Sequence, residues 1–152
     1  MKTKILLTAL VAVCASLFSF TGKWGGEGFE IYLNNKLVLQ QFGKDMNQVK
    51  TISIDPSFAS AQLSVKYYHC GQFGKKRVLA IKNDENKTLK QWTFGDSEKN
   101  SDAMRCGVKE ILDLQKVSSN KLYLYYSSSE LSKERLLATI SKGHDDSRAV
   151  IK

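Results

Sequence analysis

The sequence predicts an all-β fold, an antiparallel two-sheet sandwich that is either immunoglobulin-like or a jelly roll. Two observations support this prediction. Eight or nine short runs have the apolar-polar alternation of strands or a continuous apolar core, and turn-forming residues separate them. At most one short helix is expected. The 152-residue chain has a single proline, Pro56, and no internal repeats, so we expect one domain after the leader.

The N-terminus has the pattern of a secretory signal peptide. Lys2 and Lys4 precede an apolar run of 16 residues, 5–20. A transmembrane helix needs about 20 apolar residues, so an uncleaved anchor is the less favoured alternative. We therefore interpret 1–22 as the signal peptide and 23–152 as a single exported domain, periplasmic or secreted, without a transmembrane span.

The exact processing of the leader stays open. Cleavage after Ala15, Ser19 or Gly22 fits the small residues near the end of the apolar run. Cys14 raises lipid attachment as an alternative. Bulky Val13 argues against it, because a lipid-attachment site requires a small residue before the cysteine.

The first expected strands form a hairpin. Runs 29–33 and 36–42 flank Asn34-Asn35, a pair of residues that tolerates positive φ and so suits a two-residue turn. A direct two-residue turn would set Ile31 opposite Val38 and Tyr32 opposite Leu37.

The next four strands follow in order. A run at 49–54 ends at Pro56, which lacks the donor needed to extend a ladder. Residues 63–68 alternate as a half-buried strand does, whereas 77–81 is nearly continuous in apolar residues and is expected at the centre of a sheet. Polar residues then form a turn, and 88–94 completes a second hairpin.

The last third of the chain contains one ambiguous segment. Residues 104–108 alternate like a strand that runs into one or two helical turns, whereas a single helix over 104–115 is the competing assignment. Gly107 opposes the single helix by about 1 kcal/mol. Two alternating runs, 121–127 and 135–141, are expected to be the closing strands.

The cysteines suggest a disulfide. Beyond the leader the chain keeps an even pair, Cys70 and Cys106, and thiols of exported proteins commonly pair. A bridge across this separation of 36 residues would stabilise the fold by about 3–4 kcal/mol in the chain-entropy description.

The charge is basic. The whole chain carries +8, and without Lys2 and Lys4 the remainder carries +6. Part of the excess clusters in Lys75-Lys76-Arg77. Such an excess favours anionic partners, such as an acidic glycan or another envelope component, and also serves solubility. Nucleic acid is not an expected partner, because no recognition motif is present.

The chain has no catalytic signature. His69 and His144 are the two histidines, and the H-E-x-x-H, G-x-S-x-G and phosphate-loop patterns are absent from the sequence. His144 precedes Asp145-Asp146, which is a weak metal pattern in a polar tail. We therefore expect a protein without enzymatic activity, cofactor or metal.

Aromatic and basic residues occur together on several expected strands. Outward aromatics of a sheet can stack on sugar rings while cations hold hydroxyl or acidic groups. The pattern does not decide which aromatics face solvent. The candidate ligand-binding residues are Tyr67, Tyr68, Trp92, Tyr123, Tyr125 and Lys90.

The run KYYHCGQFGKKRVLAIKN, followed by KQWTF, together with a short leader and Asn/Lys-rich strands, resembles small exported β-sandwich proteins of Bacteroidetes-type bacteria that have no assigned activity. The resemblance implies a periplasmic or secreted location and implies no catalytic residue. The expected function is non-enzymatic binding or structural support at the cell envelope. The alternative is a carbohydrate-binding module for glycans, including acidic ones.

Overall fold

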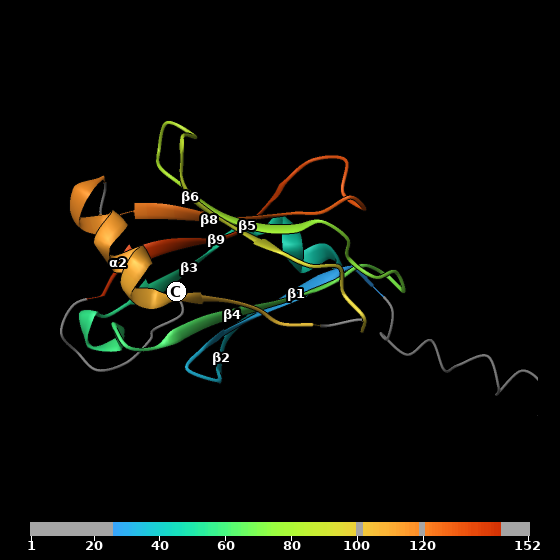
Figure 1. Cartoon of the computed structure of the whole chain (residues 1–152), viewed down its shortest axis with the longest axis horizontal. Helices are drawn as coiled ribbons and strands as arrows, with labels where there is room; N and C mark the ends of the chain where they lie inside the picture. The colour runs from blue at the N-terminus through green and yellow to red at the C-terminus, as the bar shows by residue number, and fades with distance from the viewer. Residues whose placement is uncertain (1–25, 100–101, 119–120, 144–152) are drawn as a thin grey trace, which may run out of the picture.

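The computed structural model describes residues 26–99, 102–118 and 121–143 (Figure 1). The expected leader, with Cys14, and the expected metal pattern at His144 lie outside these residues. Within them, strands form at all nine expected places and one α-helix is present. The elements are β1 (Gly28–Leu33), β2 (Lys36–Phe42), η2 (Gly43–Asn47), β3 (Lys50–Ile54), η3 (Pro56–Phe58), β4 (Gln62–Tyr68), β5 (Arg77–Lys82), β6 (Thr88–Phe94), β7 (Met104–Gly107), α2 (Val108–Val117), β8 (Lys121–Ser127) and β9 (Arg135–Lys142).

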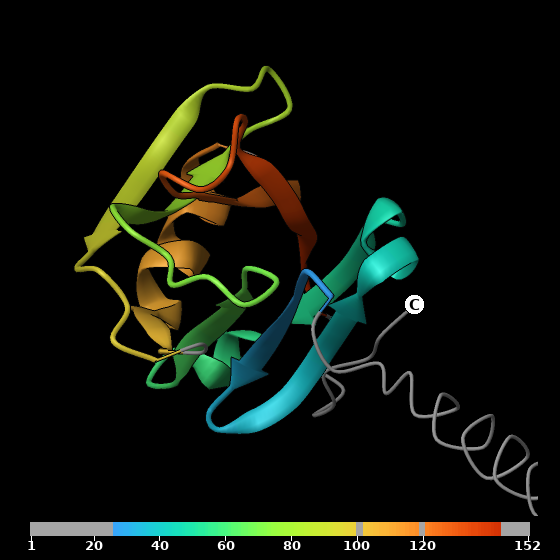
Figure 2. The same cartoon turned by 90° about the vertical axis from the view of Figure 1, so that its right-hand side faces the viewer.

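The strands form two sheets that enclose a hydrophobic core (Figure 2). Sheet A has the order β2-β1-β4-β7, and sheet B has the order β3-β9-β8-β5-β6. Helix α2 lies at one end of the two layers (Figure 1). The largest fully buried side chains include Phe29, Ile31, Leu63, Leu79, Ile81, Met104, Ile111, Leu122, Leu124 and Tyr126, which come from both sheets and from α2.

Sheet B is mixed, so the prediction of wholly antiparallel sheets is wrong for one pair of strands. β3 runs parallel to β9, with Lys50 opposite Ala138 and Ile52 opposite Ile140. Parallel neighbours need a crossover connection, and here the connection is the whole chain between 55 and 134. Alternation within a strand reports its buried face and carries no information about its partner or direction.

The first hairpin forms at the predicted turn, and Tyr32 faces Leu37 as predicted, but the register shifts beyond this pair. Asn34 and Asn35 have φ of 50° and 64°, as a two-residue turn between strands requires. A bulge then interrupts the ladder, so that Ile31 faces Leu39 and not Val38 as predicted. A bulge places two residues of one strand opposite one residue of the other, which the turn sequence alone does not reveal.

The ambiguous segment is a strand followed by a helix. β7 pairs with β4 and ends at Gly107, and α2 begins at the next residue. The helix buries the stripe that its spacing predicts, with Val108, Ile111, Leu112 and Gln115 facing the protein. The competing assignment of a single helix over 104–115 is therefore wrong.

The predicted bridge between Cys70 and Cys106 is not formed. Cys106 is a buried thiol on β7 opposite Leu63 of β4, whereas Cys70 is exposed and follows the far end of β4. Tyr68, two residues before Cys70, already lies five residues along β4 from Leu63, which corresponds to about 16 Å. A disulfide needs Cα atoms about 4.4–6.8 Å apart, so this fold keeps the two cysteines out of reach.

None of the helices within 26–99, 102–118 and 121–143 is long and apolar enough to cross a membrane.

Candidate functional site

Strand β8 separates the tyrosines of the sequence KLYLYYS between two faces of sheet B. Leu122, Leu124 and Tyr126 point inward and are fully buried. Tyr123 and Tyr125 point outward and are half-buried. Because side chains alternate along a strand, the two outward rings belong to one surface, the outer face of sheet B.

A groove lies on this outer face. It is shallow and open, has a volume of about 680 Å³, and we call it the sheet B groove. Two loops that rise above the sheet in Figure 1, the β5–β6 turn and the β8–β9 loop, contribute its sides. Its lining residues are Asn83, Asp84, Asn86, Tyr123, Tyr125, Lys133 and Glu134.

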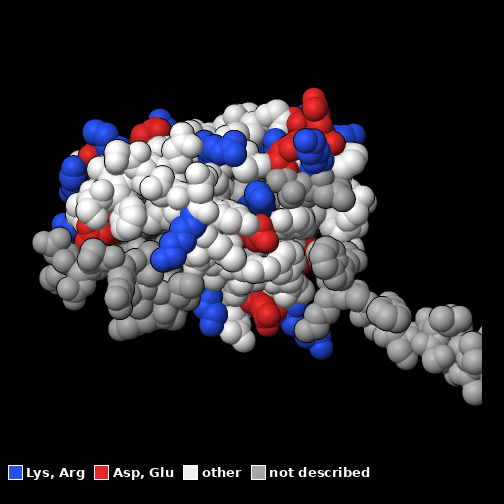
Figure 3. Space-filling view, turned by 90° about the horizontal axis from the view of Figure 1, so that it is seen from below, with Lys and Arg blue, Asp and Glu red and all other residues white. Residues whose placement is uncertain are grey.

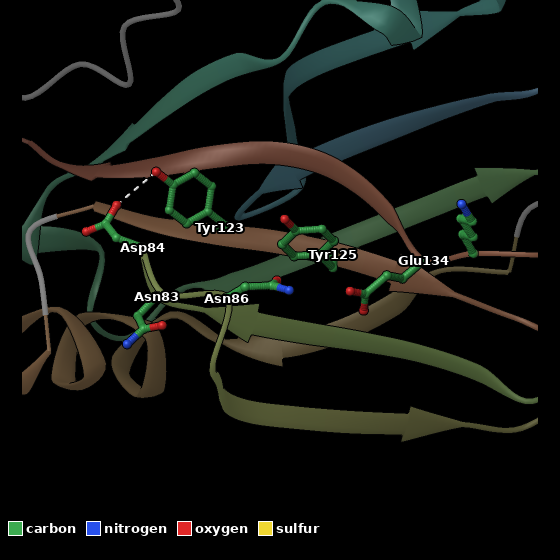
Figure 4. A pocket seen from close by; sticks show the side chains of 7 residues that line it. Asn83, Asp84, Asn86, Tyr123, Tyr125 and Glu134 are labelled. Atoms are coloured by element: carbon green, nitrogen blue, oxygen red, sulfur yellow. Dashed lines mark hydrogen bonds between the residues drawn. The ribbon is translucent and has the colours of Figure 1, made fainter.

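The two tyrosine rings lie side by side along the groove (Figure 4). Asp84 lies at the Tyr123 end, where the Tyr123 hydroxyl donates a hydrogen bond of 2.9 Å to Asp84 Oδ1. Glu134 lies at the Tyr125 end. The groove therefore has an aromatic surface with a carboxylate at each end.

The β5–β6 turn that carries Asn83, Asp84 and Asn86 is held by its own hydrogen bonds. Asn83 Oδ1 accepts from the backbone N–H groups of Glu85 and Lys87, at 3.1 and 2.9 Å. Asn86 adopts a φ of 60°, which asparagine tolerates. The turn thus places two amide side chains and one carboxylate beside the rings in a fixed arrangement.

Lys82 lies beneath this surface. It ends β5 opposite Tyr123, and its side chain is only 10% exposed. Its ammonium group is bonded to Glu134 and lies 4.8 Å from the centroid of the Tyr125 ring. At the other end, Lys121 Nζ lies 5.4 Å from the centroid of the Tyr123 ring. Both tyrosines are therefore flanked by cations.

This arrangement suits a ligand that has both an apolar face and many hydroxyl groups. Half-buried rings offer a flat apolar surface, and the amides, carboxylates and ammonium groups around them offer hydrogen-bond donors and acceptors. A sugar ring has both properties.

Trp92 and Lys90, which the sequence grouped with these tyrosines, lie elsewhere. In the β5–β6 ladder they pair with Leu79 and Ile81, whose side chains are fully buried. Directly paired residues share a face of the sheet, so Trp92 and Lys90 are on the inner side of β6. Lys90 Nζ pairs there with Glu110 of α2 at 2.7 Å.

Tyr67 is buried between the two sheets. Its hydroxyl donates to Glu27, which also pairs with Arg135 at 3.2 Å, and its ring stacks on Tyr126 with centroids 4.3 Å apart. Burial, assisted by the hydrogen bond to Glu27, raises the pKa of Tyr67 far above its usual range. Tyr67 is therefore part of the interior.

His69 completes this interior cluster. Its Nε2 atom lies 2.8 Å from the Tyr126 hydroxyl and 3.4 Å from Ser128 Oγ. Burial lowers the pKa of His69 and raises that of Tyr126 to about 12. We call Tyr67, His69 and Tyr126, with their partners Glu27, Arg135 and Ser128, the interior cluster. Its polar atoms bond one another between the sheets, which indicates a structural role.

Tyr68 points to the outer face of sheet A. Its hydroxyl and that of Tyr32 both donate to Glu30 Oε2, at 2.9 and 2.7 Å, and its ring packs against Phe42 with centroids 5.4 Å apart. On the side of the molecule seen in Figure 3, charged side chains are scattered among uncharged ones. We call Tyr32, Tyr68, Phe42 and Glu30 the sheet A patch.

The basic cluster predicted at Lys75-Lys76-Arg77 is divided by burial, because Lys75 and Lys76 are exposed and Arg77 is not. Arg77 is buried and donates to the carbonyl oxygens of Gly95 and Asp102, both at 2.8 Å. The backbone N–H groups of Lys75 and Lys76 donate to the carboxylates of Glu130 and Asp96.

The structure thus places two of the six candidate residues, Tyr123 and Tyr125, in the groove and the other four outside it. Of these four, Lys90 and Trp92 stay together, with Lys90 Nζ 5.9 Å from the centroid of the Trp92 ring. Six further residues were not predicted from the sequence: Lys82, which lies beneath the groove, and the lining residues Asn83, Asp84, Asn86, Lys133 and Glu134. One usable signal was Lys82, a lysine that ends an apolar run just before a turn rich in asparagine.

Within the described residues, no three side chains of His, Cys, Asp or Glu are grouped as metal ligands would be. The sequence matches no protein-family model, and no curated protein matches it.

Proposed function

We propose that this protein is an exported binding protein without enzymatic activity, periplasmic or secreted, and that the sheet B groove is a glycan-binding site. We further propose that the two sheets form a sandwich, a variant of the immunoglobulin-like or jelly-roll types in which one edge strand is parallel. The leader pattern at 1–22 and the resemblance to small exported β-sandwich proteins support the proposed location.

The observation that carries the binding proposal is the pair of adjacent tyrosine rings, Tyr123 and Tyr125, in a groove lined by amides and carboxylates (Figure 4). Aromatic platforms surrounded by a few polar groups are typical of small-molecule sites.

The proposal is tested by titrating the protein with a panel of oligosaccharides in a calorimeter. Tyr125→Ala is expected to weaken binding by about tenfold or more, because it removes half of the aromatic surface. Tyr68→Ala is the matched control, since Tyr68 is an outward, half-buried tyrosine on the other sheet. Equal loss of binding in both variants, or no binding by any glycan, would contradict the proposal.

Export is tested separately by sequencing the N-terminus of the protein recovered from the periplasm or the medium. The expected sequence begins after Ala15, Ser19 or Gly22. Recovery of the protein only from the cytoplasm, with its N-terminus at Met1, would contradict the proposed location.

A further inference from the structure

We infer that the sheet B groove selects neutral sugars, and that Lys82 and Glu134 bind two neighbouring hydroxyl groups of one sugar ring. The inference rests on the proposed glycan-binding function and names the class of glycan. It departs from the expectation, drawn from the basic charge of the chain, that the partner is acidic.

First, the ion pair of Lys82 and Glu134 lies at the Tyr125 end of the sheet B groove. Lys82 is on the same face of sheet B as Tyr123, its partner in the ladder, and its ammonium group lies over the ring of Tyr125. The carboxylate of Glu134, to which it is bonded, lines the groove and is 38% exposed. At the Tyr125 end the groove is therefore lined by an acceptor, Glu134, and the donor bonded to it, Lys82, lies just beneath with 10% of its side chain exposed.

The second step is the capacity of these groups for hydrogen bonds. An ammonium group has three donors, and an ionised carboxylate accepts several hydrogen bonds. The contacts of the Lys82 ammonium within the described chain are Glu134 and the face of Tyr125, which leaves donor capacity unused. A sugar hydroxyl both donates and accepts. Two neighbouring hydroxyls can thus accept from Lys82 and donate to Glu134 while the apolar face of the ring rests on Tyr125.

The third step is the local charge. The Lys82 ammonium is already neutralised by Glu134, and the other charged residues that line the groove, Asp84 and Lys133, have opposite signs, so the groove carries no excess of positive charge. A uronic acid could accept from Lys82 only by placing its carboxylate next to that of Glu134, where like charges repel. Lys133, which lines the groove, and Lys121, beside Tyr123, are the cations that would bind an acidic ligand if the inference were wrong.

The experiment compares neutral tetrasaccharides of glucose, mannose, xylose and galactose with tetrasaccharides of galacturonic and glucuronic acid, by calorimetry at low and at high salt. Neutral sugars are expected to bind with little dependence on salt. Lys82→Met and Glu134→Gln are each expected to weaken this binding about tenfold or more. Lys66→Met is the matched control, because Lys66 also lies over a tyrosine, Tyr32, but on sheet A.

The variant Glu134→Gln keeps the test valid if Lys82→Met does not fold. Lys82 is buried and its removal could unfold the protein, whereas Glu134 is an exposed loop residue whose amide analogue keeps the shape. Preferential binding of uronic acids that salt and Lys121→Ala weaken, or neutral binding that Glu134→Gln leaves unchanged, would overturn the inference alone. If the wild-type protein binds none of these glycans, or if Tyr125→Ala leaves the binding unchanged, the proposed function is overturned as well.

Discussion

The interior cluster and the sheet B groove are built from the same kinds of side chain, and β8 contributes to both. Tyr126 points inward, where its hydroxyl meets His69 Nε2 at 2.8 Å and its ring stacks on Tyr67. Tyr123 and Tyr125 point outward beneath two loops. The interior polar atoms bond one another, whereas the groove presents donors and acceptors to solvent. Residue type alone therefore does not define a binding site; position and unused hydrogen-bonding capacity do.

Mutations in the interior cluster should therefore reduce stability, and mutations in the sheet B groove should reduce binding. The largest expected effect is on stability. Tyr126→Ala should lower the free energy of unfolding by about 3–5 kcal/mol, because it removes a fully buried aromatic side chain. Urea denaturation measures the loss. Tyr126→Phe, which removes only the hydroxyl group, should cost about 1 kcal/mol. A fully stable Tyr126→Ala protein would refute the structural role of the interior cluster.

The converse prediction concerns the groove. Tyr125→Ala should weaken glycan binding about tenfold or more and lower the free energy of unfolding by about 1 kcal/mol or less, because Tyr125 is half-exposed. Calorimetry and urea denaturation of the same protein measure both effects. A large loss of stability without loss of binding would reverse the roles assigned to the two regions.

The interior cluster should also respond to pH, with a smaller effect. Burial lowers the pKa of His69 from 6.5, opposed by the carboxylates of Glu130 and Glu27 and assisted by Arg77. The Tyr67 and Tyr126 rings also pack against it. The unfolded chain therefore takes up a proton first as the pH falls through 6.5, and stability decreases until the folded pKa is reached.

Urea denaturation between pH 8 and pH 5.5 measures this slope. The variant His69→Gln should show a flatter profile, and since His144 is present in both proteins its contribution cancels. A native profile as flat as that of the variant would show that His69 is not desolvated in the folded protein.

The smallest effect is expected on the sheet A patch. Tyr68→Phe removes one of two hydroxyl groups that donate to Glu30, and Tyr32 retains the other bond. Because these groups are half-exposed, stability should change by no more than about 0.5 kcal/mol, and glycan binding should not change. Weaker glycan binding in this variant would indicate that the binding site is on sheet A and not, as proposed, on sheet B.

Local patterns predicted the strands well, because alternation and turn residues act over a few neighbours. The hairpin at Asn34-Asn35 and the strand-to-helix change after Gly107 are examples. Features that depend on distant partners were not predictable. Alternation could not show that β3 lies parallel to β9. The even number of cysteines could not show that Cys106, on β7, lies beside the opposite end of β4 from the one that Cys70 follows.

The same limit applied to the candidate site. Which tyrosines of β8 face solvent depends on the register with β5 and β9, and the groove depends on loops that approach one another only in the folded chain. Glu134 lies 52 residues from Lys82 in the sequence, so no local motif could join them.

The glycan-binding groove is tested most directly by recording amide NMR spectra of the isotope-labelled protein during titration with neutral tetrasaccharides. The signals expected to shift are those of Asn83–Asn86, Tyr123, Tyr125, Lys133 and Glu134, whereas those of the sheet A patch should stay unchanged. Shifts centred on Tyr32 and Tyr68, or an unchanged spectrum throughout the titration, would contradict the proposed binding site.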